Sequence, residues 1–241
     1  MSAPFLPLPV RRGCAHALSL CNAACGAAAV LGLAMHGPTP QALVWTLGLL
    51  VAAAVCDMFD GAAARAWGVA DVEGRALDGV CDAVSFGVAP ALALALVGME
   101  AGQPGLLAAA PLHLAAILVR LARVTARSAK PGPSSILFKG LPGPMAALTL
   151  VGALVMGAAP RPDLMPTTLL ACLSGVISVM MLSPVMWPHA RGIARLVAAQ
   201  SATDRNLGAS LLAGVFFAVY ASVGPVTALV AGSLAYILSG P

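Results

Sequence analysis

The sequence predicts an all-α fold, a polytopic bundle of membrane-spanning helices. Hydrophobic residues make up 60% of the 241 residues and charged residues only 9%, and the mean hydropathy is +0.93. A soluble globular domain has about 25% charged residues, so this composition excludes a water-soluble enzyme and a disordered chain. A net charge of only +4 without a basic cluster also argues against a nucleic-acid binder.

Proline, glycine and charged residues divide the apolar chain into segments of about 20 residues, the length that a membrane-spanning helix needs. Six helices are expected from this division, in the ranges 15–36, 40–63, 75–98, 103–126, 143–160 and 166–187. The last apolar stretch, 207–238, is too long for one span and contains Gly224-Pro225. Because proline interrupts a helix, this stretch predicts a hairpin of two short spans, which makes about eight spans in all.

Three regions follow from this division of the chain. Residues 1–187 are expected to form a six-helix transmembrane core, and residues 207–241 a C-terminal transmembrane hairpin. Between them, residues 188–206 carry Arg191, Arg195 and Arg205 and predict an amphipathic connector at the cytoplasmic face.

Basic residues predict how the chain is oriented, because they mark the cytoplasmic side of a membrane protein. An even number of spans places both termini on one side. On this topology twelve of the thirteen Lys and Arg residues fall on the side of the N-terminus, and only Arg161 falls opposite. The sequence therefore predicts an integral protein of the cell (inner) membrane with both termini in the cytoplasm.

Acidic residues are concentrated in one stretch, where six of the nine lie between positions 57 and 82. On helices, Asp57 and Asp60 are spaced i, i+3, and Asp78 and Asp82 i, i+4, so each pair shares one face. Charges at the edge of hydrocarbon are costly and like charges repel, and divalent cations would remove both penalties. Oxygen ligands without nearby His or Cys favour Mg²⁺ or Mn²⁺, and four carboxylates are enough to bridge two such ions.

Two other interpretations of these acids stay open. They could form structural salt bridges with Arg65, Arg75, Arg120 and Arg123. Acids inside membranes also line the cation pathways of transporters and channels. A transporter predicts ionisable residues near mid-membrane on several helices, whereas these acids gather at helix ends.

One segment of the sequence is similar to a known family signature. The spacing Asp57-x2-Asp60-Gly61-x2-Ala64-Arg65-x8-Gly74-x3-Asp78-x3-Asp82 resembles that of the CDP-alcohol phosphatidyltransferases at every fixed position. The resemblance implies a six-helix core, usually in a homodimer, with a dinuclear metal site at the cytoplasmic face. It also implies that the four aspartates bind two Mg²⁺ or Mn²⁺ ions and that Asp82 is the general base.

The remaining positions of the signature would contact the CDP group, and they are Gly61, Ala64, Arg65 and Gly74. Glycine lets a nucleotide approach the backbone, and arginine is a bidentate phosphate donor. Asn22 lies where such enzymes have a polar residue facing the nucleotide, although a helix-packing role stays open. The implied reaction is attack by an alcohol on the β-phosphorus of a CDP-linked lipid, with release of CMP.

Further segments resemble the members of this family that use CDP-diacylglycerol and L-serine, the phosphatidylserine synthases. These segments are Asp82-Ala-Val-Ser-Phe-Gly-Val-Ala-Pro90, Phe138-Lys-Gly-Leu-Pro-Gly-Pro144 and Arg120-Leu-Ala-Arg123. The resemblance implies that Arg120, Arg123 and Lys139 hold the lipid phosphate or the carboxylate of serine. The alternative is that these basic residues only set the topology.

Two positions depart from the serine-using group. Gly79 stands where its members usually have Ser, and Val124-Thr125 replaces their usual Phe-Asn. Neither departure touches the expected metal ligands. Another acceptor, such as glycerol 3-phosphate, choline or an inositol phosphate, therefore stays an alternative.

Overall fold

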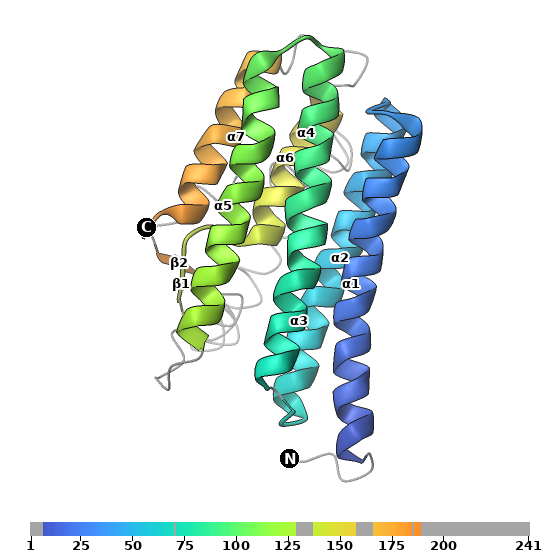
Figure 1. Cartoon of the computed structure of the whole chain (residues 1–241), viewed down its shortest axis with the longest axis vertical. Helices are drawn as coiled ribbons and strands as arrows, with labels where there is room; N and C mark the ends of the chain where they lie inside the picture. The colour runs from blue at the N-terminus through green and yellow to red at the C-terminus, as the bar shows by residue number, and fades with distance from the viewer. Residues whose placement is uncertain (1–6, 70, 129–136, 158–165, 185, 189–241) are drawn as a thin grey trace, which may run out of the picture.

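The structure is a computed structural model, and it describes residues 7–69, 71–128, 137–157, 166–184 and 186–188. These residues form a helical bundle (Figure 1), which confirms the predicted fold class. The helices are α1 (Leu8–His36), α2 (Pro40–Ala66), α3 (Val72–Asp82), α4 (Ala89–Glu100), α5 (Pro104–Ser128), α6 (Gly143–Gly157) and α7 (Thr167–Leu182). A π-helical segment, η1 (Ala83–Val88), joins α3 to α4, and two short strands, β1 (Leu137–Lys139) and β2 (Met186–Pro188), pair antiparallel.

Four helical segments in the described part of the chain are long and apolar enough to cross a membrane: Leu8–His36, Pro40–Ala66, Val72–Glu100 and Pro104–Ala126. Two shorter apolar helices, α6 and α7, pack with them in the described part of the chain. Together with the composition, these helices identify an integral membrane protein. The predicted connector at 188–206 and the hairpin at 207–238 lie outside the described residues, so the total of eight spans stays a prediction.

The helices alternate in direction, with α1 and α2 along one side of the bundle and α5 and α7 along the other (Figure 1). The continuous rod of α3, η1 and α4 runs between these two pairs. The start of α1, the end of α2, the start of α3 and the end of α5 gather at the same end of the bundle. The acids and basic residues at these helix ends are therefore brought to one end of the molecule.

The boundary of the last described helix differs from the sequence prediction. A helix was expected over 166–187, but α7 ends at Leu182, and Met186–Pro188 forms strand β2 instead. Pro184 explains the early end, because the residue before a proline avoids the helical region. Ser183 accordingly has φ −66° and ψ 153°.

The turn between β1 and α6 is fixed against the end of α7. Gly140 has φ +82°, a region that favours glycine, and a Cβ atom there would collide with the main-chain carbonyl of Met181. The next residue, Leu141, donates its N–H to the Met180 carbonyl at 3.2 Å. These contacts hold the segment that precedes α6 against the end of α7.

Two close approaches hold η1 in the centre of the bundle. A Cβ atom on Gly26 of α1 would collide with the main chain of Ser85, and a Cβ atom on Gly87 would lie 2.9 Å from Ile117 Cγ2 of α5. Small residues allow such close packing where no hydrophobic effect drives helices together. The side chain of Phe86, between these two contacts, is fully buried.

Replacing Gly26 with Ala should lower the melting temperature of the detergent-solubilised protein, because the added methyl group would collide with Ser85. Overpacking costs about 1–3 kcal/mol, more than the roughly 1 kcal/mol that alanine gains over glycine in a helix. Gly32→Ala is the matched control on α1, since its Cβ would meet no atom within 4 Å. Equal melting temperatures for the two variants would contradict the close approach at Gly26.

Candidate functional site

A cavity of about 560 Å³ opens at the end of the bundle where the helix ends gather. Side chains of α1, α2, α3 and α5 line it, together with the turn that precedes α6. All eight positions of the sequence signature line this cavity, and so does Arg120. The structure therefore brings together nine of the twelve residues that the sequence singles out.

Three of the four expected metal ligands form a tight group. Asp57 and Asp60 from α2 and Asp78 from α3 each offer a carboxylate oxygen within 4.8 Å of the others. Asp60 is only 4% exposed, and it accepts a hydrogen bond from Ser19 Oγ at 2.6 Å. Helical spacing places Asp57 and Asp60 on one face of α2. The short turn after α2 starts α3 at the same end of the bundle, which brings Asp78 to the same cavity.

The group has the features that a hard divalent cation needs. Asp78 Oδ1 is buried and has no hydrogen-bond partner among the described residues. A buried carboxylate oxygen without a partner is costly, and a cation would compensate it together with the two neighbouring carboxylates. Oxygen ligands of this kind suit Mg²⁺ or Mn²⁺. The residues present therefore fit such an ion.

Asp82, the fourth expected ligand, lines the same cavity but is not part of the group within 4.8 Å. Its Oδ1 accepts a hydrogen bond from Asn22 Nδ2 at 2.9 Å. Asn22 itself is fully buried and is absent from the described residues that line the cavity. Its main-chain carbonyl accepts a hydrogen bond from Ser85 Oγ at 2.8 Å. The structure thus places Asn22 behind Asp82, where it fixes the orientation of that carboxylate.

The glycines of the signature lie where side chains crowd the cavity wall. A Cβ atom on Gly61 would lie 2.9 Å from Arg65 Nη1, so the guanidinium group extends over this glycine. A Cβ atom on Gly74 would lie 3.0 Å from Asp71 Oδ1 and 3.2 Å from His16 Nε2. A larger residue at either position would require these neighbouring side chains to move, and glycine also leaves the backbone accessible.

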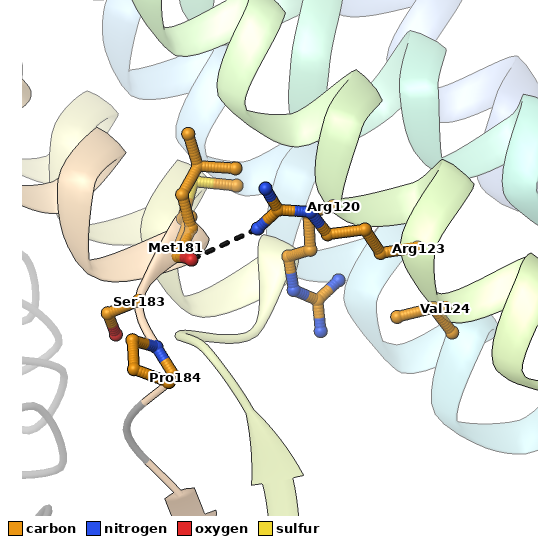
Figure 2. A pocket seen from close by; sticks show the side chains of 7 residues that line it. Arg120, Arg123, Val124, Met181, Ser183 and Pro184 are labelled. Carbon is orange, nitrogen blue, oxygen red and sulfur yellow. Dashed lines mark hydrogen bonds between the residues drawn. The ribbon is translucent and has the colours of Figure 1, made fainter.

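A second cavity, of about 160 Å³, lies between α5 and the end of α7 (Figure 2). The side chain of Arg123 reaches across it, and Nη1 donates a hydrogen bond to the Leu182 carbonyl at 3.1 Å. Arg120 lines both cavities and is only 8% exposed. Of the third basic residue expected here, Lys139, the structure describes the backbone in β1 but not the side chain.

Sequence reasoning did not single out two residues of α1 that take part in the site. Ser19 donates to Asp60, and His16 lines the large cavity next to Gly74. A signal was present, because His16, Ser19 and Asn22 recur every three residues in a stretch of α1, residues 13–35, that has no other charged or strongly polar residue. Such a polar stripe marks one face of a helix, and here that face is turned toward the aspartates.

Most of this chain matches the model of one known protein family. The model of the CDP-alcohol phosphatidyltransferase family matches residues 13–188. An archaetidylserine synthase of Methanothermobacter thermautotrophicus is 29% identical over 178 residues, which cover 73% of this chain and 70% of that protein.

Two mycobacterial relatives are similar over a shorter stretch. A CDP-diacylglycerol–serine O-phosphatidyltransferase of Mycobacterium leprae is 34% identical over 113 residues, which are 46% of this chain and 37% of that protein. A protein of the same name from Mycobacterium tuberculosis is also 34% identical over 113 residues, and the match covers 39% of its length. The chain thus matches less than half of the length of each of these two relatives.

Asp71 at the cavity rim gives a prediction about stability. Its Oδ1 accepts the Gly74 N–H at 2.7 Å and caps α3, and its Oδ2 lies 3.2 Å from Arg12 Nε. The Gly74 hydrogen bond, and secondarily the nearby charge of Arg12, lowers the pKa of Asp71 below its usual value. Asp71→Ala should therefore lower the melting temperature, and Asp71→Asn, which keeps an acceptor for Gly74, should lower it less.

The pH dependence of the Asp71 effect follows from the direction of this pKa shift. A carboxyl group whose pKa is lowered on folding contributes stability that is complete above its unfolded pKa and is lost as pH falls through the folded value. The difference in melting temperature between wild type and Asp71→Asn should stay constant from about pH 8 to about pH 5 and shrink only at more acidic pH. A difference that disappears near neutral pH would contradict this assignment.

Proposed function

The chain belongs to the CDP-alcohol phosphatidyltransferase family, and on that basis we propose that it transfers the phosphatidyl group of CDP-diacylglycerol to L-serine. The observation that carries the proposal is the cavity at the bundle end, which all eight signature positions line. Such a cavity could take the CDP group while the acyl chains stay in the bilayer. The names of the mycobacterial relatives and the segments that resemble the serine-using enzymes support serine as the acceptor.

The proposed reaction is a single displacement at phosphorus. The hydroxyl oxygen of serine forms a bond to the β-phosphorus of CDP-diacylglycerol, and the bond from that phosphorus to the bridging diphosphate oxygen breaks. CMP leaves with the bridging oxygen, and the hydroxyl proton passes to a carboxylate. The products are a phosphatidylserine, CMP and one proton.

Asp82 is the carboxylate proposed to take this proton. Asn22 donates a hydrogen bond to Asp82 Oδ1, so the carboxylate is held in one orientation and Oδ2 is the oxygen that would receive the proton. Asn22 is in turn held through its carbonyl by Ser85. A base fixed by buried hydrogen bonds needs little reorganisation during the reaction, which favours proton transfer.

Asp57, Asp60 and Asp78 are the residues proposed to hold Mg²⁺ or Mn²⁺, with Asp82 as the fourth ligand of a two-ion site. When bound, these ions would neutralise the diphosphate and stabilise the leaving group. The buried Asp78 Oδ1, without a hydrogen-bond partner among the residues that the structure describes, favours this reading over purely structural salt bridges. Arg65, extended over Gly61, would add a donor for the diphosphate.

The acceptor is proposed to bind beside Arg120 and Val124, the two residues that line both cavities. Arg120 lines both of them, and a guanidinium group is a bidentate partner for a carboxylate or a phosphate. Arg123, which reaches the Leu182 carbonyl, lies in the smaller cavity. The departures from the serine-using pattern also lie in the large cavity, where a Cβ atom on Gly79 would face Thr125 Oγ1 at 3.9 Å. Another acceptor alcohol is therefore the alternative function.

Basic residues at the cavity end of the bundle predict how the protein is oriented in the membrane. Arg65, Arg75 and Arg120 line the cavity, and Arg12 forms an ion pair with Asp71, which lines it too. Basic residues stay on the cytoplasmic side of a membrane protein. We therefore propose that the active site and the N-terminus face the cytoplasm of a cell with this protein in its inner membrane.

An acceptor panel tests the proposed reaction. Membranes containing the protein should release CMP from CDP-diacylglycerol only when both L-serine and Mg²⁺ or Mn²⁺ are present. Membranes prepared without the protein are the control. Release that depends on glycerol 3-phosphate, choline or an inositol phosphate, and not on serine, would contradict the acceptor and leave the family reaction standing.

Removing one carboxylate from the group tests the metal site. Asp78→Asn should weaken Mn²⁺ binding to the purified protein by at least about tenfold, because a charged ligand becomes neutral. Titration followed by electron paramagnetic resonance of free Mn²⁺ measures this affinity without any substrate. Glu73→Gln is the matched control, since Glu73 lies on the same helix, is exposed and does not line the cavity. Equal Mn²⁺ affinity of the Asp78→Asn variant and the wild type would rule out Asp78 as a ligand.

A further inference from the structure

We propose that His113, a buried residue of α5 outside the large cavity, is a positioning residue for Asp82. The proposal starts from η1, the π-helical segment that directly follows Asp82. His113 is 0% exposed, and its Nε2 lies 3.0 Å from the main-chain oxygen of Phe86 in this segment. The inference rests on the proposed function, in which Asp82 takes the proton of the acceptor.

The Phe86 carbonyl cannot accept the hydrogen bond that a regular α-helix would give it. In an α-helix this oxygen would accept the N–H of residue 90, four positions further along. That residue is Pro90, which has no N–H, and the ring of a proline also crowds the carbonyl four residues before it. The helix accommodates the proline by a π turn, in which the N–H of Ala89 bonds to the Val84 carbonyl five residues back. His113 supplies a donor for the Phe86 oxygen.

The hydrogen bond also defines the tautomer of His113. A carbonyl oxygen can only accept, so Nε2 carries a hydrogen in this contact. A hydrogen on Nδ1 as well would leave a buried charge and a donor without an acceptor. Nδ1 is buried without a hydrogen-bond partner among the described residues. The imidazole is thus neutral in this arrangement, and its one hydrogen bond within the described structure goes to η1.

Three contacts hold η1 from opposite sides. On the side of α1, Ser85 Oγ donates to the Asn22 carbonyl, and the main chain of Ser85 packs against Gly26. On the side of α5, His113 holds Phe86. Because a π turn rotates the helix face relative to a regular α-helix, these contacts decide where the residues on either side of it point.

Asp82 is the residue immediately before η1, and its carboxylate meets the side chain of Asn22. The same Asn22 accepts the Ser85 hydroxyl through its main chain. A change in η1 would therefore shift Asp82 and its hydrogen-bond partner relative to each other. His113 acts on the reaction through this geometry and touches no substrate.

Two substitutions of similar polarity test the proposal. The amide nitrogen of Gln can occupy the place of Nε2, whereas the shorter Asn leaves its amide nearer to the place of Nδ1. His113→Gln should keep kcat within about threefold of wild type, and His113→Asn should lower kcat by at least about tenfold, with KM for CDP-diacylglycerol within about twofold. Thr149→Val is the control, because Thr149 is equally buried but donates only to Met145 of its own helix α6.

A purely structural role for His113 predicts a different result. In that case His113→Asn would lower the melting temperature, while kcat per folded molecule would equal that of wild type, and this outcome would overturn the proposal. A double-mutant cycle with Asn22→Ala sharpens the test, because both substitutions disturb Asp82. The kcat of the double variant should be within about twofold of the kcat of the slower single variant. If the two fold-losses in kcat instead multiply in the double variant, His113 and Asn22 act independently, which would contradict the proposal.

A measurement without substrate separates this proposal from the proposed function. Amide hydrogen exchange of residues 83–92 should be at least about fivefold faster in His113→Asn than in His113→Gln, with no such difference in Thr149→Val. Equal exchange in the two His113 variants would overturn the inference even if the enzyme is active. Wild-type protein that releases no CMP with any acceptor would instead refute the proposed function.

Discussion

The rest of the structure depends on one constraint, the placing of several carboxylates at the end of an apolar helix bundle. Asp57, Asp60 and Asp78 approach within 4.8 Å where α2 turns into α3. Charges so close together at a membrane are tolerated only with donors or cations around them. The neighbouring elements meet this need, since Ser19 donates to Asp60 and arginines line the same cavity. The helix ends that build the site are therefore also those that carry most of the charge.

The continuous helical segment of α3, η1 and α4 extends from the polar cavity into the apolar interior of the bundle. Its first part, Val72–Asp82, carries cavity residues, and its second part, Ala89–Glu100, is an apolar helix within the bundle. The π turn lies at the junction, directly after the last aspartate of the signature. Close packing against Gly26 and Ile117 leaves this turn little freedom. The rigid core of the bundle thus extends up to the residue proposed as the base.

Much of the site could be predicted because its residues lie close in sequence. Helical spacing placed Asp57 with Asp60 on one face and Asp78 with Asp82 on another, and the structure brings oxygens of Asp57, Asp60 and Asp78 together. The end of α7 was predicted incorrectly. The apolar run continues to residue 187, but α7 ends at Leu182, because Pro184 keeps Ser183 out of the helical conformation. The pairing of β1 with β2 joins residues about 50 positions apart, and local pattern gives no signal for such a pairing.

By itself, the sequence determined that this is a membrane-embedded helical protein and predicted that four of its acids gather in one site, because composition and helical spacing are local properties. Only the tertiary structure decided that Asn22 lies behind Asp82 and that His113 meets the Phe86 carbonyl. Both contacts join helices far apart in the chain, and each depends on how closely those helices pack. The nearly uniform apolar sequence between such residues carries little information about which of them meet.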